Sequence, residues 1–215
     1  MVAGREHTIR ELGGDGARLP DSKRVPSRAA FATPILGGKE IVAQIQDRML
    51  RAAKLDPQLF EEVEADQGAM GQAVTVVVLS SVAAGIGSLG YGGGLSGIVT
   101  GTIAALLGWY IWAFLTYFIG TRLLPEPNTK ADYGELLRTI GFSSTPGLIR
   151  IFGIIPGITG LVFSVAGVWM LVAMVIAVRQ ALDYESTWRA LGVCAIGWVT
   201  QGLVLAAAYS ILVTP

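Results

Sequence analysis

The chain has 215 residues, of which 52% are hydrophobic and 15% are charged, and its sixteen basic and sixteen acidic residues cancel. Soluble domains carry about a quarter charged residues, so this composition argues against a soluble protein, and the zero net charge gives no reason to expect a nucleic-acid partner. The single cysteine, Cys194, excludes both an internal disulfide and a cluster of thiolate metal ligands.

The charged residues are distributed unevenly. None lies in the 55 residues between Asp66 and Arg122, none between Arg150 and Arg179, and none after Arg189. A charge at the middle of a bilayer costs about 2.5–3.5 kcal/mol on insertion scales, and these gaps are filled mainly with aliphatic residues and glycine. The sequence therefore predicts an all-α integral membrane protein whose spans occupy the gaps.

The first 66 residues precede the predicted spans. Residues 1–38 are polar and rich in Gly and Pro, so we expect a disordered tail. Residues 39–54 predict an amphipathic helix, with apolar positions repeating every four residues and basic positions every three. The apolar residues are Ile41, Ile45 and Met49, and the basic ones are Arg48, Arg51 and Lys54. Such a helix suits the surface of an anionic leaflet, and packing on the protein's own loops is an equal alternative.

A second cytoplasmic helix is predicted within residues 55–66. Asp56 can cap its start, and Pro57 suits the first helical position. Its acidic residues are Glu61, Glu62, Glu64 and Asp66. A cation site is one interpretation of these carboxylates, and a solvated helix face is the favoured one.

Residues 67–215 predict a five-helix transmembrane domain. The expected spans are 69–89, 97–121, the segment 134–157, 158–178 and 190–212. Residues 85–97 are glycine-rich and predict the first turn. Each uninterrupted span reaches about 30 Å, enough to cross the hydrocarbon layer.

Whether the segment 134–157 crosses decides the topology. If it crosses, fifteen of the sixteen basic residues share one side, and only Arg150 lies on the other. If it does not, Arg179 and Arg189 move outside. The positive-inside rule therefore favours five spans, with the N-terminus in the cytoplasm and the C-terminus outside.

This segment carries unusual polar residues for a span. Pro146 has no N–H, so the carbonyl of Phe142 loses its helical partner, and neighbouring hydroxyl groups can satisfy the freed groups. The residues of this predicted kink are Ser143, Ser144, Pro146 and Gly147. We also expect Glu135 to pair with Arg138, and Arg150 to extend outward to the membrane surface.

The predicted spans contain no catalytic constellation, metal-ligand cluster or phosphate-binding loop. We therefore expect no catalytic residue, no metal, no cofactor and no enzymatic activity. Glycines are frequent instead, in two pairs at four-residue spacing: Gly97 with Gly101, and Gly153 with Gly157. Such glycines allow close helix contact, either inside the bundle, which is the favoured interpretation, or with partner spans.

The order of these features resembles the Yip1 domain family, especially its prokaryotic members, over residues 47–215. The similarity rests on the stretch before the first span, which runs from residue 48 to residue 66, and on a polar entry followed by a proline kink. The matching positions of that entry and kink are Tyr133, Gly134, Leu137, Ser143, Ser144, Pro146 and Gly147. The resemblance implies a five-span helical membrane protein with a cytoplasmic N-terminus, and it implies no catalytic residues.

Together these observations favour a non-enzymatic adaptor, scaffold or accessory subunit in a prokaryotic cytoplasmic membrane. Its expected partners are the lipid bilayer and other membrane-protein subunits, and a homo-oligomer is an open alternative. Two further functions stay open: a small-molecule or lipid permease that uses the kinked third helix, and a membrane-shaping protein that uses the amphipathic helix.

Overall fold

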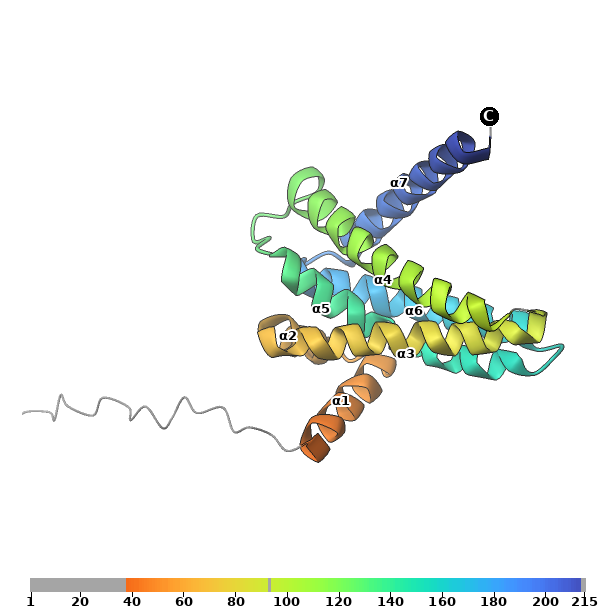
Figure 1. Ribbon diagram of the computed structural model, residues 1–215. Helices are drawn as coiled ribbons and strands as arrows, with labels where there is room; N and C mark the ends of the chain where they lie inside the picture. Colours follow the sequence, from red (N-terminus) through yellow and green to blue (C-terminus); the bar gives the residue numbers. More distant parts are fainter. Residues whose placement is uncertain (1–37, 93, 214–215) are drawn as a thin grey trace, which may run out of the picture. The chain divides into compact units, whose positions relative to one another are not determined.

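The computed structural model describes residues 38–92 and 94–213, and side chains are described as far as residue 203. Except for Gly38, the expected disordered tail lies outside the described residues. The described part is helical, without strands. Its elements are α1 (Gly38–Ala53), α2 (Pro57–Ala65), η2 (Gln67–Ala69), α3 (Met70–Ser88), η3 (Leu89–Tyr91), α4 (Leu95–Phe118), η4 (Ile119–Leu123), α5 (Tyr133–Ser143), η5 (Thr145–Ile154), α6 (Thr159–Ala181) and α7 (Thr187–Val213) (Figure 1).

Side-chain caps explain where several helices begin. The carboxylate of Asp56 accepts a hydrogen bond from the backbone N–H of Gln58 at 3.1 Å, at the start of α2. Asp132 and Glu135 form a reciprocal capping box at the start of α5. Glu135 is thereby engaged at the helix start, which leaves Arg138 to find other partners.

Within the described residues, three helices are long and apolar enough to cross a membrane. They cover Gln67–Tyr91, Leu95–Leu123 and Thr159–Ala181. These ranges correspond to the spans predicted at 69–89, 97–121 and 158–178. A helix, α7, also occupies the position of the last predicted span, whereas the segment 134–157 is divided into an α-helix and a 3₁₀-helix.

The divided segment lies between α3 and α6. Along α3, Gly141 packs against Ala73, Gly147 faces Ser80, and Gly153 meets Gly87. The segment therefore runs in the same direction as α3 and accompanies it along its length. Helix α6 also packs against η5, whose first residues are buried, whereas Ile151, Phe152 and Ile154 near its end are exposed.

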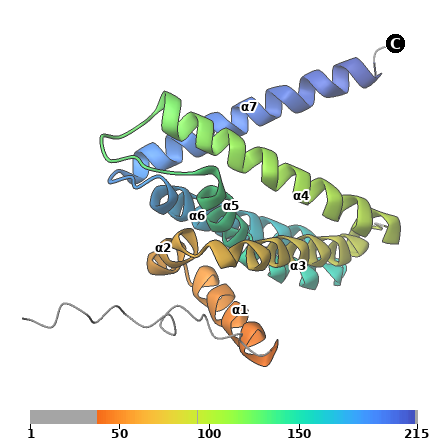
Figure 2. The same ribbon diagram turned by 60° about the vertical axis from the view of Figure 1, so that its left-hand side comes forward.

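Helices α4 and α7 are more peripheral. Near its start, α4 contacts α3, where Ser81 donates a hydrogen bond to Thr102 at 3.2 Å. Further along, Trp109 of α4 donates to the carbonyl of Leu137 in α5 at 3.1 Å. Helix α7 meets α4 where Gly197 packs on Trp112, and the two helices diverge from there (Figure 2).

The buried apolar core lies toward the end of the bundle where α2, α5 and the end of α6 meet. There Phe60 and Val63 of α2 pack with Phe142 of α5 and Ala177 of α6. A second cluster joins the end of α4 to α5, α6 and α7. Arg48, Arg51 and Arg138 also lie at this end, where each bonds to α2 or to a residue that flanks it.

Candidate functional site

The break between α5 and η5 is built from hydroxyl groups around Pro146. The hydroxyl of Thr145 donates to the carbonyl of Phe142 at 2.7 Å, and the hydroxyl of Ser143 donates to that of Ile140 at 2.7 Å. The carbonyl that the proline cannot serve is thus satisfied locally. After Ser144 the chain continues as a 3₁₀-helix with the proline in its first turn.

Arg150 points toward the middle of the bundle. Its backbone lies beside Gly87, near the end of α3, whereas its guanidinium group reaches Ser80, seven residues earlier. Two turns of α-helix correspond to about 10 Å. The expectation that Arg150 extends outward to the membrane surface is therefore wrong: hydrogen-bond acceptors in the interior hold the side chain in the opposite direction.

Three hydrogen bonds fix this guanidinium group. Its Nε donates to the carbonyl of Gly147 at 3.0 Å, and one terminal nitrogen donates to the hydroxyl of Ser80 at 2.8 Å and to the Ser80 carbonyl at 3.3 Å. A Cβ at Gly147 would fall within 3 Å of the Ser80 hydroxyl, the guanidinium group and the Met170 sulfur. Glycine is required here because the arginine and its acceptor occupy the space of a side chain.

A cavity of about 280 Å³ adjoins this arginine. Its polar lining comes from Ser144, Arg150 and Gln201, and three tryptophans also contribute: Trp109, Trp112 and Trp198. The indole N–H of Trp112 is buried and meets no acceptor in the described part of the chain. No carboxylate lines this cavity among the described residues.

Arg48 anchors α1 to α2 and α3. It is only 4% exposed, and one terminal nitrogen lies 2.8 Å from Glu62 and 2.9 Å from Asp66. Its other terminal nitrogen donates to the side chain of Gln72 at 2.9 Å. The structure thus differs from the sequence-based grouping of Arg48 with membrane-surface residues: the acidic residues of α2 draw it inward.

Arg51 extends the same network. It contacts Asp56 at 2.8 Å and Glu62 at 2.6 Å. The hydrogen bond from Arg51 lowers the pKa of Asp56 below its ordinary value. Burial acts to raise the pKa of Glu62, but the bonds from Arg51 and Arg48 outweigh it, so this pKa is also lowered.

The other residues assigned to the membrane surface lie on one helix with different exposure. Ile41 is 46% exposed. Ile45 and Met49 are partly buried against the core formed by α2, α3 and α5, and Lys54 is exposed. Helix α1 therefore packs on the protein's own helices and still presents apolar side chains outward.

Arg138 does not pair with Glu135. Its Nε donates to the carbonyl of Val63 at 2.9 Å, and a terminal nitrogen donates to the carbonyl of Glu64. Glu135 is held by the capping box with Asp132, so the expected pair does not form. The arginine instead closes the carbonyl end of α2.

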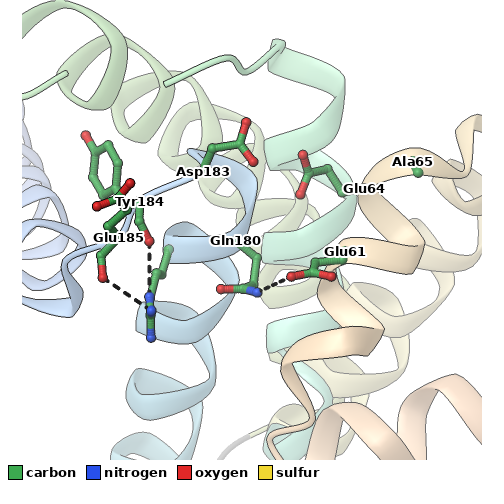
Figure 3. A pocket seen from close by; sticks show the side chains of 8 residues that line it. Glu61, Glu64, Ala65, Gln180, Asp183, Tyr184 and Glu185 are labelled. Atoms are coloured by element: carbon green, nitrogen blue, oxygen red, sulfur yellow. Dashed lines mark hydrogen bonds between the residues drawn. The ribbon is translucent and has the colours of Figure 1, made fainter. Parts of the chain in front are cut away.

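An acid-rich pocket of about 450 Å³ lies at this end of the bundle, between α2 and the end of α6. Figure 3 shows Glu61, Glu64 and Asp183 around it, with Glu61 accepting a hydrogen bond from Gln180 at 2.7 Å. Burial, together with the nearby charges of Glu135 and Asp183, raises the pKa of Glu64 to about 7. Among the described residues, no group of three or more His, Cys, Asp or Glu side chains could hold a metal ion.

The four predicted contact glycines lie in different environments. Gly97 and Gly101 are exposed on α4, with nothing within 4 Å of the position of a Cβ. Gly153 packs closely against Gly87 and Phe163. Gly157 lies beyond the end of η5, in a turn with φ of 89°, so the second pair does not form one helix face.

Sequence reasoning missed the cavity beside Arg150. Its lining comes from α3, α4, α5, η5, α6 and α7, and no local pattern links such distant residues. One signal was available, because Gly147, Arg150 and Gly153 are spaced by three, which is the period of a 3₁₀-helix.

The comparison with protein families identified one matching family. A family model described as the Yip1 domain matches residues 55–209. The comparisons with curated proteins and with solved structures gave no match.

Proposed function

Since the chain belongs to the Yip1 domain family, we propose that it crosses the membrane five times and serves, without catalysing a reaction, as an adaptor or accessory subunit of a larger membrane complex. In this proposal the N-terminus is cytoplasmic, the C-terminus is outside, and the host membrane is a prokaryotic cytoplasmic membrane. The family and the three long apolar helices indicate a membrane protein; the number of spans, the orientation and the role are the proposal.

The length of α5 and η5 supports a crossing by the divided segment. Eleven α-helical residues and ten 3₁₀ residues extend together for about 36 Å at their usual rises. A typical hydrocarbon layer is about 30 Å thick. Because the segment accompanies α3 along its length, both would enter and leave the bilayer on the same sides.

The distribution of basic residues supports the orientation. Arg138, in the first half of α5, bonds to α2, so the start of α5 lies at the end occupied by α1 and α2. Arg189, near the start of α7, contacts Glu126 in the loop before α5 at 3.2 Å, which places the start of α7 beside that loop. A reporter that is active only in the cytoplasm, fused after Pro215, should be inactive. High activity of that fusion would contradict an odd number of spans.

The adaptor proposal rests on the exposed face of α4. Gly97 and Gly101 meet no other part of the described chain, although glycines at this spacing let two spans approach closely. The large apolar side chains on the exposed surface of this helix include Val99, Ile103, Leu107, Ile111, Phe114 and Phe118. A span of another membrane-protein subunit is the occupant that such a surface fits.

The test is co-purification of the full chain from its own membranes in a mild detergent. Replacing Gly97 and Gly101 by Leu should remove a stoichiometric membrane partner. Gly167→Leu is the matched control, because Gly167 is also exposed, with nothing near its Cβ position, but lies on α6. Loss of the partner in the control alone, or recovery of only single chains from the unaltered protein, would contradict the proposal.

A second role is proposed for α1 as a helix on the cytoplasmic leaflet. Its outward apolar residues are Ile41, Val42 and Leu50, each at least 46% exposed. Ile41→Glu should weaken the association of an N-terminal segment with anionic vesicles without changing the stability of the bundle. Equal association of the altered and unaltered segments with the vesicles would contradict the membrane-surface role.

One observation favours a permease as the second candidate function. Ser144, beside the proline break, lines the cavity next to Arg150. If the cavity is part of a pathway for a small molecule or a lipid, Ser144→Ala should change flux in liposomes. A change in thermal stability with unchanged flux would restrict the break to a structural role.

A further inference from the structure

Arg150 is a cation in the interior with an incomplete set of partners. Its two bonded nitrogens reach only the neutral groups of Gly147 and Ser80. The third nitrogen, Nη1, donates to no atom of the described chain, and Arg150 takes part in none of the ion pairs found there. A guanidinium group stays protonated in proteins, so in the five-span layout this charge lies within the hydrocarbon layer without a counter-ion.

The cavity beside Arg150 offers further donors and no acid. Ser144 and Gln201 also line the space. The remaining lining is apolar or aromatic and includes Met170 and Met174. A cation with an unpartnered donor beside a mainly apolar cavity is typical of a site for a ligand with one charged group and an apolar body.

Helices α4 and α7 both contribute to the lining of this cavity, and Figure 2 shows that they diverge along part of their length. In the five-span layout both helices cross the bilayer, so a ligand that reaches the cavity past them comes from the lipid phase rather than from water. The cavity volume of about 280 Å³ is near the lower limit of ligand pockets, enough for a headgroup oxyanion while the chains remain between the helices.

We infer that this cavity binds an oxyanion, phosphate or carboxylate, carried on an acyl chain, with Arg150 as its counter-ion. Charge-assisted bonds to an oxyanion are the strong bonds of a guanidinium group. The site rests on the five-span layout and is independent of the adaptor role. An acyl-chain anion would connect α4 and α7 with η5, which carries Arg150.

The test uses the full chain in phosphatidylcholine nanodiscs, with native mass spectrometry of retained lipid. Phosphatidylglycerol, oleate and inorganic phosphate are the three probes. Arg150→Gln should weaken retention of phosphatidylglycerol or oleate by about tenfold or more, as expected for the loss of a charge-assisted bond. Arg189→Gln is the matched control, because that arginine pairs with Glu126 outside the cavity.

A second variant keeps the test decisive if Arg150→Gln does not fold. Gly108 lines the cavity and has nothing within 4 Å of its Cβ position, so Gly108→Leu takes up space in the cavity while Arg150 itself is kept. It should reduce retention to the same extent while thermal unfolding stays cooperative. Retention of both acyl-chain probes at the unaltered level in these variants would overturn the inference, and so would binding of inorganic phosphate alone.

Discussion

Replacing Arg48 by Gln should release α1 from the bundle. The arginine is 4% exposed and contacts two carboxylates, Glu62 and Asp66, which are themselves 41% and 39% exposed. Breaking a fully buried pair costs about 3–5 kcal/mol, and an exposed pair contributes about 0.2–1 kcal/mol. Because water can solvate the two carboxylates once the arginine is gone, we expect a loss of about 2 kcal/mol.

Hydrogen exchange of the α1 amides in nanodiscs measures this loss directly. A change of about 2 kcal/mol in the opening free energy increases exchange by about 30-fold. Lys54→Gln is the control, since Lys54 is an exposed cation near the end of the same network and has no ion pair among the described residues. If both variants exchange at the rate of the unaltered protein, the network does not hold α1, and the reasoning fails.

Three further predictions concern other parts of the bundle. The pKa of Glu64 in the folded protein is about 7, above its value in the unfolded chain, so ionisation of Glu64 lowers the stability as the pH rises. Glu64→Gln should therefore stabilise the protein by about 1–2 kcal/mol at pH 8 but not at pH 4, as measured by denaturant titrations at the two pH values. Gly147→Ala should lower stability by about 1–3 kcal/mol through crowding, whereas Gly167→Ala, in open space, should raise the melting temperature slightly; equal shifts would contradict the close fit. Tyr184→Phe removes a donor to two carbonyls and should cost about 1–3 kcal/mol, while Tyr91→Phe, at an exposed position, should cost little in the same melting assay.

The helices with uninterrupted apolar stretches could be predicted from sequence. Apolar helices coincide closely with the predicted ranges 69–89, 97–121 and 158–178. An uncharged apolar stretch of that length satisfies its backbone hydrogen bonds in a membrane by forming an α-helix. The family could also be predicted, from the order of its polar and apolar segments. Both signals are local in the sequence, which is why they could be found without a structure.

Side-chain direction could not be predicted in the same way. The sequence places Arg48 on the membrane surface because basic positions repeat every three residues on an amphipathic helix, and it directs Arg150 outward because a long side chain near a helix end can extend into water. The structure turns both inward, toward distant acceptors: Asp66 for the first and Ser80 for the second. Those acceptors lie 18 and 70 residues away in the sequence, so helix periodicity carries no information about them.

The 3₁₀ geometry of η5 has a consequence for length changes in this segment. With three residues per turn, Gly147, Arg150 and Gly153 form one row along the helix, and each extra residue rotates the chain by about 120°. One inserted residue after Gly147 would carry the guanidinium group to the direction now taken by Ile151, whose side chain is 41% exposed. Related chains can therefore vary in the length of their loops. They must keep the number of residues between Gly147 and Gly153 unchanged if the arginine between these glycines is to keep its direction.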